Sequence, residues 1–133
     1  MEHKSFSYNG ATITCHTETG RLYIRRLTAQ VVLGLNERDT EGKRTLSDEE
    51  YMERTQFAAI YVQSTVEGDL GFVWPESVND APAMSAACES WLNLPGKVIA
   101  QWMQTINEVD ASPNDPDLKP PEVVSKKSEA TPT

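Results

Sequence analysis

Apolar and polar residues alternate over the first part of the chain, which is typical of strands with one buried face. The apolar members of this pattern are Phe6, Tyr8, Ala11, Ile13 and Cys15. Asn9-Gly10 interrupts the alternation as a two-residue hairpin turn does, because both residues tolerate positive φ. A second turn signal follows at Glu18–Gly20. We therefore predict a short meander of two or three strands from about Ser5 to Arg26.

The next two segments carry weaker signals. Leu27–Leu35 combines β-prone valines with a polar start that suits a helix, so its periodicity leaves a strand and a short helix both open. Asn36–Thr45 is polar and charged and contains Gly42. We expect this second segment to be an exposed, mobile loop.

A helix is predicted from Ser47 to about Ser64. Ser47-Asp48-Glu49-Glu50 has the form of a capping box, in which the serine hydroxyl accepts a backbone N–H and Glu50 reaches back to the cap. The two preceding acids also suit the positive end of a helix dipole. Apolar residues at helical spacing, including Phe57, continue the pattern.

Two further helices are predicted in the second half, after a strand. Leu70–Trp74 alternates and stops at Pro75, which favours a strand. Asp80 can cap a helix over Pro82–Asn93, with its proline in the first turn where no donor is needed. Pro95–Val109 has the strongest amphipathic pattern in the chain.

The composition changes after Asp110. Prolines at five positions between residues 113 and 132 oppose regular structure, and large apolar residues become rare. We therefore predict one α+β domain over residues 1–110, in which N-terminal strands pack against a mainly helical half. Residues 111–133 are predicted to be a Pro-rich, polar, disordered tail.

Composition excludes several classes of partner. The chain has 20 acidic and 12 basic residues and a net charge of −8, which disfavours nucleic acid and anionic membrane surfaces. No apolar run approaches the ~20 residues that span a bilayer, and the N-terminus lacks the apolar core of a signal peptide. Cys15 and Cys88 are far apart, and we interpret them as partly buried free thiols of a reducing cytoplasm, with a disulfide as the alternative.

The chain offers no recognisable catalytic set, so we expect no enzyme and no cofactor. His16 follows Cys15, but adjacent strand residues point to opposite faces and cannot easily share a site. The acids at Asp48–Glu50 are explained by the helix start. No phosphate-binding glycine loop, zinc spacing or nucleophile elbow occurs.

The aromatic residues of the second half are candidates for protein binding. Three tryptophans occur within 29 positions, and they either form the core or line a groove for an apolar helix of a partner, where Trp is a common hot spot. The candidate partner-binding residues are Trp74, Trp91, Ile99, Trp102, Met103 and Ile106.

The stretch from Phe57 to Pro120 resembles the small tail assembly chaperones encoded before the tape measure protein of long-tailed bacteriophages. The carrying segments are Phe57–Val62, Leu70–Pro75, Cys88–Pro95, Val98–Trp102 and Asp110–Leu118. The resemblance from Phe57 to Pro120 spans about half of the chain, and the segments that carry it are structural rather than catalytic.

The resemblance implies a chaperone of the host cytoplasm that is absent from the mature virion. It implies binding to the tape measure protein, possible self-association, and recruitment of tail tube protein through a longer, frameshifted form. Lys126-Lys127 is compatible with a slippery codon pair. The alternative is a structural virion component, such as a head–tail connector or a minor tail protein.

Overall fold

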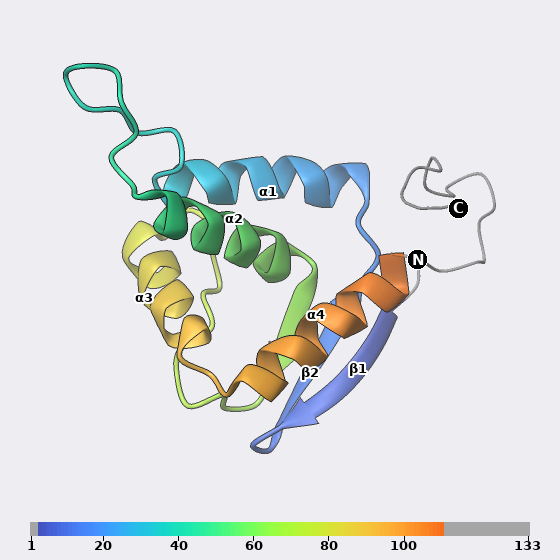
Figure 1. Cartoon of the computed structure of the whole chain (residues 1–133). Coiled ribbons are helices and arrows are strands. Elements are labelled where there is room, and N and C mark those ends of the chain that lie inside the picture. Colours follow the sequence, from blue (N-terminus) through green and yellow to red (C-terminus); the bar gives the residue numbers. More distant parts are fainter. Residues whose placement is uncertain (1–2, 111–133) are drawn as a thin grey trace, which may run out of the picture.

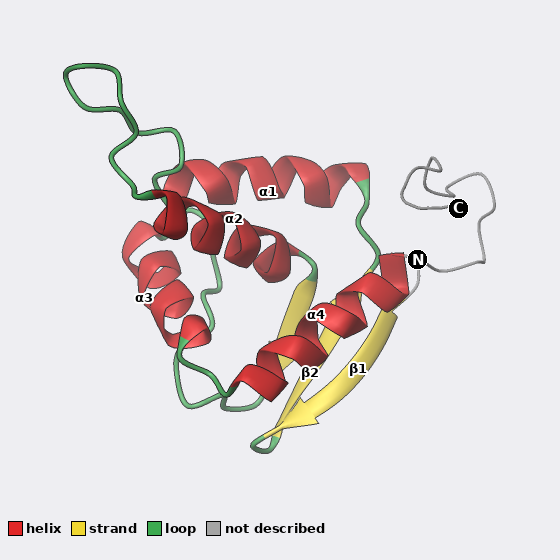
Figure 2. Ribbon diagram, viewed as in Figure 1, coloured by secondary structure: helices red, strands yellow, loops and turns green. Residues whose placement is uncertain are grey.

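A three-stranded antiparallel sheet and four helices make up residues 3–110, which are the residues that the computed structural model describes (Figures 1 and 2). This arrangement confirms the predicted α+β class. The predicted disordered tail, 111–133, lies outside the described residues. The elements in chain order are β1 (His3–Tyr8), β2 (Ala11–His16), α1 (Gly20–Val32), α2 (Asp48–Val62), β3 (Ser64–Glu67), α3 (Ala81–Leu92) and α4 (Gly96–Asp110).

The predicted N-terminal hairpin is confirmed. β1 pairs with β2 in a register that sets Phe6 opposite Ile13, and Asn9 and Gly10 both have positive φ, at 53° and 85°. Such φ values are those of the two-residue turns that match the twist of antiparallel strands. β2 also pairs with β3, so the order across the sheet is β1-β2-β3.

Residues 20–32 form helix α1, so the prediction of strand structure up to Arg26 was wrong. The hydroxyl of Thr19 accepts a hydrogen bond from the Leu22 backbone N–H at 3.2 Å and caps the helix. The third strand of the sheet is instead β3, which lies much later in the chain. Leu27–Leu35, for which strand and helix were both open, is helical as far as Val32. Gly34 follows the helix with a φ of 89°.

Leu70–Trp74 is not a strand, which corrects a second prediction. Asp69 Oδ1 accepts the Gly71 backbone N–H at 2.7 Å, and Gly71 has a φ of 92°, so the chain turns here. Leu70 is nevertheless buried in the core, although it lies in a segment without regular structure. Helix α2 also ends earlier than predicted, at Val62, because Ser64–Glu67 pairs with β2.

The predicted helices that begin near Ser47, Pro82 and Pro95 are confirmed as α2, α3 and α4. The capping box at Ser47 is present, with Glu50 N–H donating to the serine hydroxyl at 3.1 Å and Ser47 N–H donating to Glu50 at 3.0 Å. The Asp80 side chain caps α3 by accepting from Ala83 N–H at 3.2 Å. The loop 36–45 is exposed throughout.

Helix α4 crosses one face of the sheet (Figure 1). An aromatic cluster packs around Trp102 of this helix. Trp102 stacks on Trp74 with ring centroids 5.4 Å apart and meets Trp91 edge-on at 6.2 Å. Phe6 approaches Trp102 from β1 at 5.8 Å. The indole N–H of Trp102 donates to the Ser64 hydroxyl at 2.8 Å, within the core. The cluster therefore joins α3, α4, β1 and β3.

Trp91 and Trp102 are both fully buried, but they differ in their polar atom. Trp91 Nε1 finds no hydrogen-bond partner among the described residues, whereas Trp102 Nε1 bonds to Ser64. Trp91→Phe removes an unsatisfied donor, while Trp102→Phe leaves the Ser64 hydroxyl without its donor. We therefore expect Trp102→Phe to lower the free energy of unfolding by about 1–3 kcal/mol more than Trp91→Phe, measured by urea denaturation. Equal losses would show that the Ser64 bond contributes nothing.

Candidate functional site

The six residues predicted to bind a partner lie in or against the core. Trp91 and Trp102 are 0% exposed and Ile106 is 7% exposed, so a partner cannot reach them in this fold. These three residues are core residues, which was the alternative interpretation. The remaining three, Trp74, Ile99 and Met103, are partly buried and pack against the same core.

Helix α1 carries apolar residues on two opposite faces. Its inner face packs Ala29 into the core, next to the buried Leu33 that follows the helix. Its other face exposes four large apolar side chains, which we call the outer stripe: Tyr23 (46% exposed), Ile24 (65%), Leu27 (42%) and Val31 (55%). Positions i, i+1, i+4 and i+8 lie on one side of a helix, so these side chains form one continuous strip.

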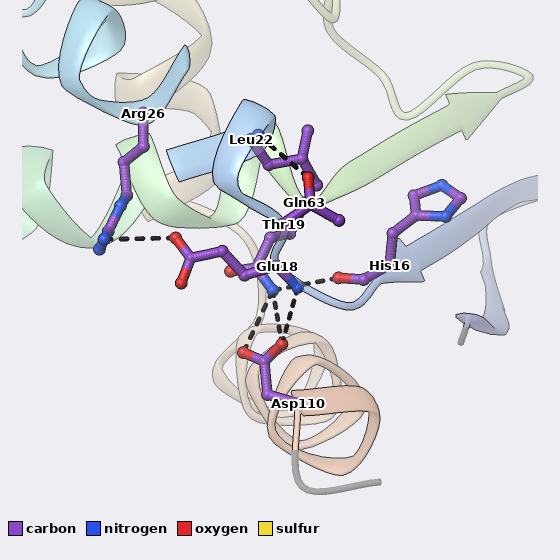
Figure 3. Close-up of polar contacts among 7 residues, drawn as sticks. All are labelled: His16, Glu18, Thr19, Leu22, Arg26, Gln63 and Asp110. Atoms are coloured by element: carbon purple, nitrogen blue, oxygen red, sulfur yellow. Dashed lines mark hydrogen bonds and ion pairs between the residues drawn. The ribbon is translucent and has the colours of Figure 1, made fainter. Parts of the chain in front are cut away.

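The start of α1 is fixed by a polar cluster in which three other elements meet (Figure 3). The Glu18 backbone N–H donates to Asp110 Oδ1, at the end of α4, at 3.1 Å. The side-chain amide of Gln63 donates to the same carboxylate at 3.1 Å and to the His16 carbonyl at 3.0 Å. These bonds join the ends of β2, α2 and α4 immediately before α1, so the helix begins from an anchored point.

An ion pair and a ring contact link this cluster to the outer stripe. Arg26 pairs with Glu18 at 3.2 Å (Figure 3), and its guanidinium lies over the Tyr23 ring, 5.0 Å from the centroid. This arrangement restrains Tyr23 at one end of the strip. A pre-ordered aromatic side chain loses less conformational entropy when it binds a partner.

The charge of α1 is opposite to that of the whole chain. The helix contains Arg21, Arg25 and Arg26 and no acidic residue, whereas the chain has a net charge of −8. Arg25 lies over the ring of Tyr61, 5.4 Å from its centroid, which holds this arginine beside α2. The outer stripe is thus an apolar strip on the basic element of an acidic protein.

The outer stripe was not predicted from the sequence, because the apolar spacing before Arg26 also fits the period of a strand. At 100° per residue, Leu22 and Ala29 fall on one side of the helix and Ile24 and Val31 on the other. The sequence therefore already contained the pattern of a helix with two apolar faces. A helix with only one face buried by its own domain leaves the second available to a partner.

The described residues offer no metal centre. No group of three or more His, Cys, Asp or Glu side chains within residues 3–110 could hold a metal ion. His16 has a pKa lowered by partial burial and by the neighbouring His3. None of the helices in the same range is long and apolar enough to cross a membrane.

No protein-family model, no curated protein and no solved structure matches this chain. The candidate site therefore depends on the geometry of the chain's own residues. Among residues 3–110, the outer stripe is the largest set of exposed large apolar side chains on one element, since the other two, Met52 and Val73, lie on α2 and in a loop.

Cys15 and Cys88 are both buried free thiols, as predicted. Burial is the main cause that raises the pKa of each from 9.0 to about 11. Because only the thiolate reacts with iodoacetamide, the reactive fraction at pH 8 is roughly a hundredfold lower than for a thiol of normal pKa. We expect intact-mass analysis to find both cysteines unmodified in the native protein and both alkylated in urea. Rapid native labelling of either residue would contradict its burial.

Proposed function

We propose that this chain is a non-enzymatic protein-binding protein, and that its particular role is that of a bacteriophage tail assembly chaperone. In this role it binds the tape measure protein in the host cytoplasm and keeps it soluble. It also helps to recruit tail tube protein and is absent from the mature virion. The resemblance over Phe57–Pro120 suggests this role, and the outer stripe of α1 is the observation that supports it.

The outer stripe has the form that a helical partner requires. Tyr23, Ile24, Leu27 and Val31 expose apolar surface along about two turns of a rigid helix. Two amphipathic helices bury such stripes against each other by packing ridges into grooves. A long helical protein with exposed apolar stripes is held in solution when it is covered by many copies of a protein with such a face.

Charge favours an acidic partner over a second copy of this chain. Arg21 and Arg26 flank the outer stripe, whereas Arg25 lies against Tyr61. Two α1 helices packed stripe to stripe in parallel would bring these two flanking arginines of one copy close to those of the other. Like charges across an interface cost binding energy and select against that pairing. The expected occupant is therefore a tape measure helix whose apolar stripe is flanked by Glu or Asp.

The acidity of the rest of the molecule suits a coating role. With 20 acidic and 12 basic residues, copies arrayed along one partner present a negatively charged outer surface. Such surfaces repel one another and keep large assemblies soluble. The basic helix, by contrast, faces the partner in this arrangement.

The function is tested by co-expression of this chain with the tape measure protein. Ile24→Glu and Leu27→Glu each place a charge within the outer stripe, and neither side chain is buried in the core. We expect the wild-type chain to keep the tape measure protein in the soluble fraction, and each variant to lose most of that effect. Quantitative gel analysis of soluble and pelleted fractions measures the outcome.

Met52→Glu is the matched control, because it introduces the same charge at an apolar side chain that is 72% exposed on α2. It should behave as the wild type does, and all three variants should keep their melting temperature within a few degrees. If the tape measure protein is equally soluble without this chain, the chaperone role is wrong. If mass spectrometry of purified virions finds this chain in stoichiometric amount, it is instead a structural component.

A further inference from the structure

Strand β3 has a free edge in the described structure. β3 is the last strand of the sheet order and pairs with β2 on one side (Figure 2), and no described strand lies on its other side. The His16 N–H donates to the Gln63 carbonyl at 2.7 Å, which sets the phase of the β2–β3 ladder. Because bonded pairs alternate in an antiparallel ladder, Thr65 and Glu67 bond to β2.

The backbone groups of Ser64 and Val66 consequently point away from β2. Each directs one N–H and one C=O to the outer edge, spaced as an added strand requires. Val66 is partly exposed, and Ser64, which is 5% exposed, lines both hollows at this edge. Protein edges are commonly protected by proline, by lysine or by a bulge. β3 has the sequence Ser-Thr-Val-Glu and none of these features, although it is short.

Two adjoining hollows lie along this edge, of about 760 and 480 Å³, and both are lined by Arg25, Ser64 and Thr65. The larger hollow continues to Phe72 and Trp74, in the irregular segment after β3. The smaller one continues towards the start of α1. Together they form one groove, with the free edge at its base, an aromatic wall at one end and a helix at the other.

The groove has a different charge at each end. Arg21 and Arg25 line its end near Ser64, and no acidic residue lines the smaller hollow there. Asp69, which follows the C-terminal end of β3, lines the larger hollow at the opposite end. A strand lying in the groove would therefore meet positive charge at one end and negative charge at the other.

We propose that the outer edge of β3 is a second protein-binding site, which takes an extended peptide segment as an added antiparallel strand. The segment carries an acidic side chain near its C-terminal end, where it meets Arg21 and Arg25, and a β-branched or apolar side chain that faces Phe72 and Trp74. Main-chain bonds to Ser64 and Val66 supply binding, and the groove supplies selectivity. This site is separate from the outer stripe, so either can fail without the other.

The test is amide NMR of the full chain titrated with capped peptides. The first probe is Ac-Lys-Val-Thr-Val-Thr-Glu-NH₂, and the second replaces its Glu by Lys. The third is the first probe with every backbone nitrogen methylated, so that none of its residues can donate a main-chain hydrogen bond along either edge. We expect the first probe to give saturable shifts that are largest at the amides of Ser64 and Val66. The second should bind at least about fivefold more weakly, and the methylated probe should not bind.

Two variants locate the acidic contact. Arg21→Gln and Arg25→Gln should each weaken the first probe several-fold and remove the preference over the second probe, while melting temperatures confirm that each variant is folded. Arg21 is tested as well because Arg25→Gln also removes the contact with the Tyr61 ring and can act through that loss. The inference is overturned if no saturable shift appears at millimolar peptide, if the methylated probe binds equally well, or if the largest shifts fall on the outer stripe.

Discussion

The packing of Trp102 between helix α4 and the sheet is the interaction on which the rest of the structure depends. Its ring contacts Trp74, Trp91 and Phe6, and its indole N–H bonds to Ser64 at the start of β3. A buried indole without an acceptor is costly, so Ser64 fixes where α4 lies over the sheet. Because the strongest amphipathic helix is used in this way, its apolar side builds the core and is not free to bind. A surface for the proposed partner therefore has to come from another element.

We propose that this element is α1, which the polar cluster fixes at its start and whose other side packs on the core. The Asp110 carboxylate accepts hydrogen bonds from the Glu18 backbone N–H and the Gln63 side-chain amide, so the end of α4 and the start of α1 are fixed together. The inner face of α1 then meets the core at Ala29, and Tyr23, Ile24, Leu27 and Val31 remain outside. The two proposed surfaces differ in kind: the outer stripe offers side chains to a helix, and the β3 edge offers backbone to an extended strand.

Local signals predicted the parts of the fold that local chemistry determines. Asn9-Gly10 and Ser47–Glu50 made the hairpin and the α2 start predictable, because a turn and a capping box need only neighbouring residues. The third strand could not be assigned in the same way. Ser64–Glu67 is four residues long and directly follows a helix, so its pairing with β2 is a tertiary effect. The alternation at Leu70–Trp74 was misleading because Asp69 and Gly71 form a turn there. The sequence left the tryptophans open between core and partner groove, and the structure places Trp91 and Trp102 in the core because of how α3 and α4 pack.

The most direct measurement is covalent surface labelling of this chain, alone and in a purified complex with the tape measure protein, followed by mass spectrometry of peptides. If the outer stripe is the contact surface, labelling of Tyr23, Ile24 and Leu27 falls strongly in the complex, while Met52 keeps its labelling. Trp91 and Trp102 remain unlabelled in both states, because the core stays closed. Unchanged labelling of α1 in the complex, or new labelling of Trp102, would contradict a closed domain that binds through its first helix.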